Sequence, residues 1–211
     1  MKERDMALMK LDHVAVACET LDAGRAYVED ALGVSLQPGG KHAHFGTHNM
    51  LLGLADGLYL EVIAVDPGAG HLPYPRWFDL DRFGGAPRLT NWICQTEDMD
   101  ALRSALPEMG SPVALTRGAL RWSMAVPPDG ALPFYNRFPA IIAWGAGTTH
   151  PSDVLIASGC RLTELVISHP EAGDLEARIR PYMDAPIVVF EPGEPGMRAT
   201  FDTPHGQRVL T

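Results

Sequence analysis

The chain has 211 residues, of which 46% are hydrophobic, and its formal net charge is −9. A chain of this length and composition can bury a substantial core, which excludes a disordered protein. Its acidic balance and its lack of Lys or Arg runs exclude a protein that binds the phosphate backbone of nucleic acids.

The N-terminal segment MKERDMALMK is charged and lacks the apolar stretch of a signal peptide, and no later segment has the length of a membrane span. We therefore predict a cytoplasmic protein without a membrane partner. The three cysteines, Cys18, Cys94 and Cys160, show no C-x-x-C spacing. This pattern predicts neither a disulfide framework nor a zinc finger.

The first elements in chain order are a strand, a helix and three further strands. The apolar run LDHVAVA predicts a strand over 11–17, and the helix that follows ends at Gly33. Three more strands are expected near 34–37, 43–54 and 58–65, separated by PGG and ADG turns. The helix is predicted from apolar residues at helical spacing, namely Leu21, Ala26, Tyr27, Ala31 and Leu32.

Two polar residues, His13 and Glu61, interrupt the apolar strands of this first unit. Alternate side chains of a strand share a face, so each of the two lies among apolar neighbours. A charged group on a half-buried sheet face needs a partner, which could be a cation, a network of hydrogen-bond donors or a metal. The pair therefore predicts a site.

Two later segments repeat the pattern of the first unit. They begin at Leu89 and Leu162, which gives offsets of 78 and 73 residues. Self-similarity at such a period indicates a repeated supersecondary unit, here of β-α-β-β-β order. Segment 66–88, rich in Pro, Gly and aromatic residues, is typical of a functional lid or crossover. The later strands are expected over 112–117, 121–127, 137–144, 187–190, 197–201 and 207–210.

Four motifs carry a resemblance to a known family: LDHVAVA (11–17), PGGKHAHFGTHNMLLGL (38–54), DGLYLEVIAVDP (56–67) and AIIAWGAGTTHP (140–151). With these motifs the chain resembles the glyoxalase-like branch of the vicinal oxygen chelate superfamily. The resemblance implies an α+β fold in which repeated βαβββ units form curled mixed sheets around a central pocket.

The expected domain boundaries follow from the repeat and the resemblance together. A glyoxalase-like domain is predicted over 9–151, with βαβββ units at 9–67 and 89–151 joined by a loop at 68–88. A third, divergent βαβββ-like unit is predicted over 160–211, packed on the same domain.

The resemblance implies that His13 and Glu61 are ligands of a divalent metal such as Fe, Mn, Ni or Zn, with no organic cofactor. The second unit offers only Asn91 and Ala140 at the equivalent positions. The third unit offers Glu164, so a three-ligand set requires the first and third units to face each other. The alternative is a His–Glu pair that is satisfied without metal.

Two further histidines are candidates for acid–base catalysis. His42 matches a motif position, and His150, followed by Pro151, matches the family's His-Pro element; His150 could equally cap a turn. On one continuous strand, His42, His44 and His48 would share a face, and Thr47 and Asn49 would share the opposite one.

Six residues are predicted to bind substrate. Trp77 is placed at the pocket mouth because its loop has no periodicity that would bury it, and Arg76 beside it could receive a carboxylate. Thr47 and Asn49 could orient a ligand oxygen. The predicted set is Thr47, Asn49, Tyr59, Arg76, Trp77 and Trp122.

These expectations favour a metal-dependent enzyme that acts on a small substrate with vicinal oxygens, as a lyase, an isomerase or a dioxygenase. The alternative is a metal-free protein that binds or sequesters a small molecule, as resistance proteins of the superfamily do. A descendant that kept the fold and lost the site is a third reading. The expected partner is a small molecule, and pairing of units across a homodimer stays open.

Overall fold

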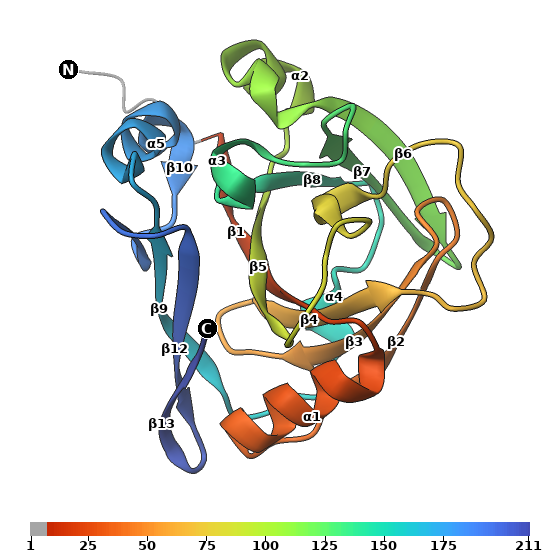
Figure 1. Ribbon diagram of the computed structural model, residues 1–211, viewed down its shortest axis with the longest axis vertical. Helices are drawn as coiled ribbons and strands as arrows, with labels where there is room; N and C mark the ends of the chain where they lie inside the picture. Colours follow the sequence, from red (N-terminus) through yellow and green to blue (C-terminus); the bar gives the residue numbers. More distant parts are fainter. Residues whose placement is uncertain (1–7) are drawn as a thin grey trace.

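The computed structural model describes residues 8–211, which form two β-sheets with short helices (Figure 1). The larger sheet has the strand order β2-β3-β4-β1-β5-β8-β7-β6, and β10 adds to the free side of β1 at one end. Its strands are β1 (Met9–Ala17), β2 (Gln37–His42), β3 (Thr47–Gly53), β4 (Tyr59–Val65), β5 (Arg88–Gln95), β6 (Ser111–Arg117), β7 (Leu120–Val126), β8 (Ala140–Trp144) and β10 (Met183–Asp184).

The smaller sheet has the order β11-β9-β12-β13 and is built from the last quarter of the chain. Its strands are β9 (Arg161–Ser168), β11 (Val188–Glu191), β12 (Gly196–Thr203) and β13 (Gly206–Leu210). The helices are α1 (Leu21–Leu32), α2 (Met99–Ala105), α3 (Pro133–Asn136), α4 (Pro151–Val154) and α5 (Ala172–Ile179), with single turns η1 (Trp77–Asp79), η2 (Pro107–Met109) and η3 (Arg180–Tyr182).

The larger sheet curls around a concave face, as Figure 1 shows. One half, β2-β3-β4-β1, comes from the first repeat and the other half, β5-β8-β7-β6, comes from the second. The halves meet where β1 pairs with β5 in antiparallel fashion. The predicted α+β fold with curled mixed sheets is confirmed, and a pocket on the concave face draws on both repeats.

Helix α1 has the termini that the sequence predicts. The Thr20 hydroxyl accepts a hydrogen bond from the Ala23 amide at 3.2 Å, and the helix ends at Gly33 in the left-handed conformation, with φ of 72°. Gly24 lies on the buried face, where an added Cβ would approach Val62 to 2.5 Å. The helix can therefore pack closely on β4.

The predicted continuous strand over 43–54 is wrong, because the chain turns at residues 43–46 between β2 and β3. The alternating pattern favours a strand, but Gly46 adopts a φ of 58°, which reverses the chain. His42 then pairs directly with Thr47 across the hairpin. His42 and Thr47 thus share a face, contrary to the expectation that the histidines lie opposite Thr47 and Asn49.

Strand β1 contains a bulge at Asp12. Its pairing with β5 shifts between Leu11 and His13, so that Asp12 is the extra residue. A bulge changes the direction in which side chains project, and here it lets two consecutive residues meet: Asp12 Oδ1 lies 2.6 Å from His13 Nδ1. Simple strand alternation would have separated these two side chains.

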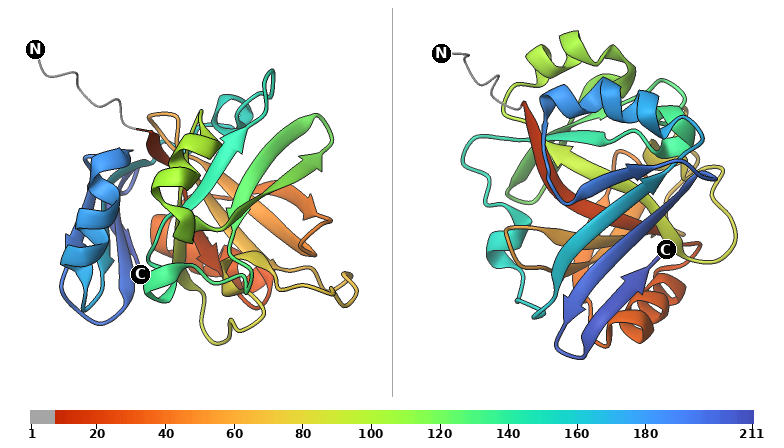
Figure 2. Two further views of the ribbon diagram at one scale, coloured as in Figure 1. Left: turned by 90° about the horizontal axis from the view of Figure 1, so that it is seen from above. Right: turned by 90° about the vertical axis from the view of Figure 1, so that its left-hand side faces the viewer.

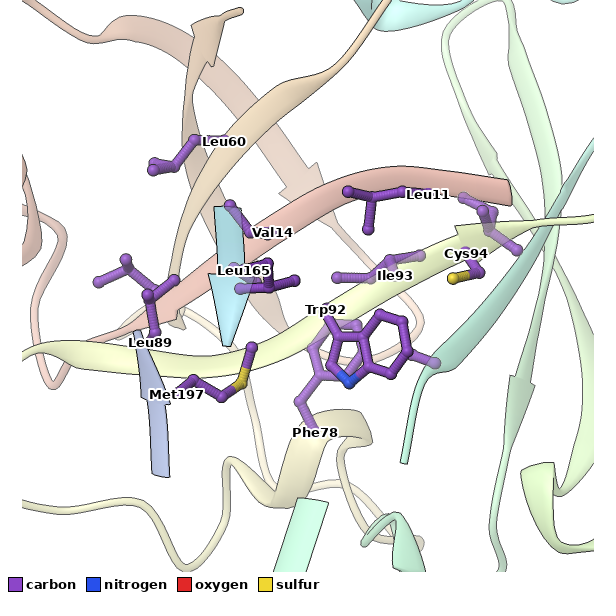
Figure 3. Close-up of a cluster of buried hydrophobic side chains, with 14 of the residues drawn as sticks. Leu11, Val14, Leu60, Phe78, Leu89, Trp92, Ile93, Cys94, Leu165 and Met197 are labelled. Atoms are coloured by element: carbon purple, nitrogen blue, oxygen red, sulfur yellow. The ribbon is translucent and has the colours of Figure 1, made fainter. Parts of the chain in front are cut away.

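The smaller sheet packs against the outside of the larger one (Figure 2). Trp92 of β5 is fully buried there, and its ring lies 6.1 Å from that of Phe190. Figure 3 shows Leu165 and Met197 of the smaller sheet in the same cluster as Val14, Leu89 and Trp92. This apolar layer supports the strands that carry the concave face.

We predict that Trp92→Ala lowers the free energy of unfolding by about 3–5 kcal/mol, because it empties a fully buried aromatic site. Val209→Ala, at a side chain that is 46% exposed on β13, should change it by less than about 0.5 kcal/mol. Urea unfolding of both variants provides the measurement. Similar losses in the two variants would contradict this account of the sheet packing.

Candidate active site

A small cavity lies on the concave face of the curled sheet, with a volume of about 40 Å³. Strands β1 and β4 position its central residues. His13 of β1 lies directly opposite Tyr59 of β4, and Glu61 lies one row further along, opposite Ala15. Trp77 and Phe78 of η1, in the loop between the two repeats, form part of its wall. The polar lining consists of His13, His42, Asn49, Tyr59, Glu61 and Arg117.

Asp12 is the hub of the polar groups at one end of the cavity, and sequence reasoning missed it. Its carboxylate accepts from His13 Nδ1 at 2.6 Å, from Trp144 Nε1 at 2.9 Å and from His150 Nε2 at 3.0 Å. The side chain is fully buried. The sequence signal for Asp12 was a carboxylate next to a histidine inside an apolar strand, because a buried carboxylate needs hydrogen-bond donors.

The buried charges of Asp12 and His13 stabilise each other. Burial raises the pKa of the Asp12 carboxyl, but hydrogen bonds from His13 and His150 outweigh burial and hold this pKa below its usual range. Burial also opposes the charged form of His13, yet its interactions with Asp12 and Glu61 raise the pKa of the imidazole to about 9. His13 is therefore protonated and Asp12 ionised at neutral pH.

Glu61 faces His13 from the neighbouring strand. Asn49 Nδ2 donates to Glu61 Oε1 at 2.7 Å, whereas Glu61 Oε2 lies 3.7 Å from His13 Nε2, which makes an ion pair without a hydrogen bond. Burial alone would raise the pKa of Glu61, but His13 above all, and Asn49 to a smaller extent, lower it. The carboxylate is thus ionised, with one oxygen anchored and the other facing the imidazolium.

His42 is held in the neutral form beside a cation. Its Nδ1 contacts the Thr47 hydroxyl at 3.0 Å, and its Nε2 lies 3.2 Å from Arg117 Nη1. Burial above all lowers the pKa of His42, the charge of Glu61 opposes the shift and that of Arg117 adds to it, and the net pKa is about 4. Arg117 also donates to Asn49 Oδ1 at 3.3 Å. This arginine comes from the second repeat and was not predicted from the sequence.

Aromatic rings surround the polar groups. Tyr59 stacks on His13 with ring centroids 4.2 Å apart, and burial raises the pKa of its phenol, with the Asp12 and Glu61 charges adding to the shift. The rings of Trp77 and Trp122 meet that of His42 edge-on, at 5.1 Å and 6.1 Å. The site therefore offers an apolar enclosure around a polar centre.

The structure brings most of the predicted site residues to one place. His150 caps the first turn of α4, where its Nδ1 accepts from the Ser152 amide at 3.3 Å, and its Nε2 reaches Asp12. His150 therefore both caps a turn and lies next to the site. The predicted residues at or next to the cavity are His13, His42, Thr47, Asn49, Tyr59, Glu61, Trp77, Trp122 and His150.

Two predicted residues lie elsewhere. Arg76 pairs with Asp81 at 2.6 Å and lines a separate surface hollow, so it does not reach the cavity. Glu164 is on β9 of the smaller sheet, where it pairs with Arg198 at 3.2 Å. The first and third units do not face each other across a pocket, because the third unit packs on the outside of the curled sheet.

The residues present do not fit a metal centre of the predicted kind. A catalytic metal normally takes about three protein ligands, and His13 Nε2 with Glu61 supplies two. Within residues 8–211, no group of three His, Cys, Asp or Glu side chains has the geometry to hold a metal ion. The Arg117 guanidinium, beside His42 and Asn49, adds positive charge to the lining of the same cavity.

Residues 11–183 match the family model of the Glyoxalase-like domain. The chain belongs to this family. The match spans both repeats that line the cavity and continues through β9 and α5, and it confirms the resemblance predicted from the sequence motifs. Among proteins with curated descriptions, none matches this chain.

Several solved structures are similar to this glyoxalase-like chain. A hypothetical protein from Staphylococcus aureus is 15% identical with a TM-score of 0.61, and the match covers 88% of this chain and 86% of that one. A methylmalonyl-CoA epimerase from Mycobacterium tuberculosis is 23% identical with a TM-score of 0.44, covering 67% and 93%. The likeness to the Staphylococcus aureus protein, at this identity, concerns the fold alone. No helix within residues 8–211 is long and apolar enough to cross a membrane.

We predict that the stability of the protein falls in alkaline solution because of His13. Its pKa is raised on folding, so the resulting stabilisation is complete below about pH 6.5, the usual histidine value, and is lost as the pH rises through about 9. Asp12→Asn should lower the pKa of His13 and make stability less dependent on pH, because it removes the charged partner that raises this pKa most.

The measurements are an NMR titration of His13 and urea unfolding between pH 6 and 9.5. Asp30→Asn, at an exposed position of α1, is the matched control and should leave both curves as in the wild type. An unchanged His13 titration in Asp12→Asn would show that Asp12 does not hold the imidazolium.

Proposed function

We propose that this glyoxalase-like protein is an enzyme that moves a proton at a carbon atom next to a carbonyl group of a small substrate. The observation that carries the proposal is the pair formed by His13 and Glu61, 3.7 Å apart on the concave face. Their environments keep one group protonated and the other ionised at the same pH. Such a pair supplies an acid and a base.

Each partner is held so that one atom faces the cavity. Asp12 accepts the Nδ1 proton of His13, which leaves the Nε2 proton directed toward Glu61. Asn49 anchors Glu61 Oε1, which leaves Oε2 to take a proton. In the proposed reaction, Glu61 Oε2 removes the proton from carbon while His13 Nε2 donates a hydrogen bond to the carbonyl oxygen.

Positive charge is available where the substrate oxygen would become negative. His13 is an imidazolium, and Arg117 lines the same cavity from the second repeat. Fixed charges and donors inside a buried site stabilise a developing oxyanion more than water does, because they need no reorganisation. The return of the proton from Glu61 to a neighbouring atom on the same face, with His13 supplying a proton to the oxyanion, completes an isomerisation.

The small cavity implies that substrate entry moves part of its wall. Its volume of about 40 Å³ has room for only a few water molecules, since roughly 10–15 Å³ of such space holds one. The obvious moving part is η1, because Phe78 and Asp79 hold the left-handed conformation, with φ of 59° at each. Displacement of Trp77 and Phe78 would open the concave face, and their return would exclude water.

No step of the proposed reaction passes through a metal. The predicted three-ligand centre of His13, Glu61 and Glu164 lacks its third ligand, because Glu164 belongs to the other sheet. The protonated state of His13 also competes with metal binding, which requires the neutral imidazole.

We expect Glu61→Gln to slow proton exchange at the substrate carbon by about 10²- to 10⁴-fold, the usual contribution of a general base. The assay incubates the protein in D₂O with a panel of small keto acids, hydroxy ketones and short acyl thioesters, and follows deuterium incorporation by NMR. Glu164→Gln is the matched control and should retain the wild-type rate. Undiminished exchange in folded Glu61→Gln would overturn the assignment of the base.

The metal content of the same preparations separates the two mechanisms. For protein purified without chelators, we expect well under one Fe, Mn, Ni or Zn per chain, and exchange that survives EDTA. One metal per chain that is lost in His13→Ala and Glu61→Ala would instead support the metal-dependent reading.

Binding without turnover is the second candidate function, and the aromatic enclosure favours it. Trp77 is buried and stacks on Phe45 at 4.4 Å, and its indole N–H has no hydrogen-bond partner among residues 8–211. Its unused donor could serve a ligand that is held between rings and never altered, as in a sequestering protein.

Trp77→Phe tests this candidate, because it keeps an aromatic ring and removes the indole. We expect a ligand of the exchange panel to quench tryptophan fluorescence in the wild type, and to lose most of that signal in Trp77→Phe. Glu61→Gln should retain the signal. Quenching without exchange for every compound that binds would favour sequestration over catalysis.

A further inference from the structure

A second hollow lies on the other side of Phe78, which forms a wall of both this hollow and the cavity. Its volume is about 130 Å³, larger than that of the cavity. Arginines dominate its lining, and they come from the 66–88 segment, from β5 and from the chain after α3. The polar lining consists of Asp79, Arg82, Arg88, Thr90, Asn136 and Arg137.

The charges around this hollow are not balanced. Asp79, the one carboxylate of the lining, pairs with Arg82 at 2.6 Å. Within residues 8–211, neither Arg88 nor Arg137 has a carboxylate within ion-pair distance. Burial and, to a smaller extent, the charge of Arg88 together lower the pKa of Arg137 to about 10. Two arginines that repel each other without an anion between them form an electropositive site.

Main-chain oxygens and an aromatic ring position both arginines. Arg88 Nη1 donates to the carbonyl oxygens of Gly84 and Ala86, at 3.0 Å and 3.2 Å, and its guanidinium lies 4.4 Å from the Phe83 ring centroid. Arg137 Nη1 donates to Thr90 O at 3.0 Å. The planar groups are thus held in place before any anion arrives, and their remaining donors are available to one.

Two buried polar atoms beside the hollow lack partners in the structure. They are Arg137 Nε and the hydroxyl oxygen of Thr90. Buried polar atoms are normally hydrogen-bonded, so each unsatisfied one calls for an explanation such as a missing ligand. Because both atoms are buried in the structure, an oxyanion reaches them only by displacing the neighbouring side chains, and it then offers acceptors to both donors.

The turn at α3 adds a strained wall to the same hollow. Phe134, Tyr135 and Asn136 are all left-handed, with φ of 54°, 52° and 63°. Non-glycine residues rarely adopt this conformation in succession, and such strain is concentrated at ligand clamps and switch regions. The Leu132 amide donates to Asn136 Oδ1 at 2.7 Å, which holds the turn with Tyr135 and Asn136 at the hollow.

We propose that this hollow binds an oxyanion group of a small molecule, a phosphate or a carboxylate, between Arg88 and Arg137. The planar fork of each guanidinium suits two oxygens of such a group. The proposal does not depend on catalysis at Glu61, because the residues that would bind the anion take no part in the proton transfer.

Isothermal titration with inorganic phosphate and, separately, with acetate tests the site at constant low ionic strength set by NaCl. We expect at least one of the two anions to bind the wild type. Arg88→Gln and Arg137→Gln should each weaken that binding about tenfold to a hundredfold, the effect of losing hydrogen bonds to a charged group. Arg208→Gln, an exposed arginine of β13, is the matched control and should bind as the wild type does.

Two further variants keep the test independent of folding defects. Arg137→Lys retains the charge and should weaken binding less than Arg137→Gln does. Thr90→Val removes an unpartnered hydroxyl, so it should not lower the melting temperature of the free protein, yet it should weaken anion binding. Preference for phosphate or acetate assigns the class of the anion. Failure of both anions to bind, or wild-type affinity in folded Arg88→Gln, would overturn the proposal.

Discussion

The polar centre of this protein depends on one buried contact, the 2.6 Å hydrogen bond between His13 and Asp12. Each partner alone would be a costly buried charge, and together they are stable because the bulge in β1 lets consecutive side chains meet. The same carboxylate holds Trp144 and His150 from the second half of the chain. Because Asp12 holds Nδ1 of His13, the other ring nitrogen, Nε2, is oriented toward Glu61.

The curled sheet turns two similar repeats into one site with unequal contributions. The first repeat brings the ionised groups His13 and Glu61, while the second brings Arg117 and the aromatic walls Trp122 and Trp144. A chain whose second repeat lacks metal ligands can therefore still complete a charged pocket. The charged side chains are paired across strands, and their opposite pKa shifts are the physical basis of the acid–base function that we propose.

Segment 66–88 links the two hollows of the molecule through Phe78. It forms part of the wall of the cavity that contains Glu61, and it supplies Arg88 to the hollow that also contains Arg137. Left-handed backbone at Phe78 and Asp79 shows that this closure is held under strain by its surroundings. The long crossover, predicted from its composition to be a lid or a crossover, is thus part of the walls of both hollows.

The sequence by itself determined the repeat, the fold class and the position of His13 and Glu61 on buried strands, because apolar periodicity and turn residues are local signals. It also placed most of the cavity residues. Only the tertiary structure decided that Asp12 reaches His13, that Arg117 joins from the other repeat, and that Glu164 lies in a separate sheet. Bulges, strand register and packing between sheets depend on contacts distant in the chain, which no local pattern contains.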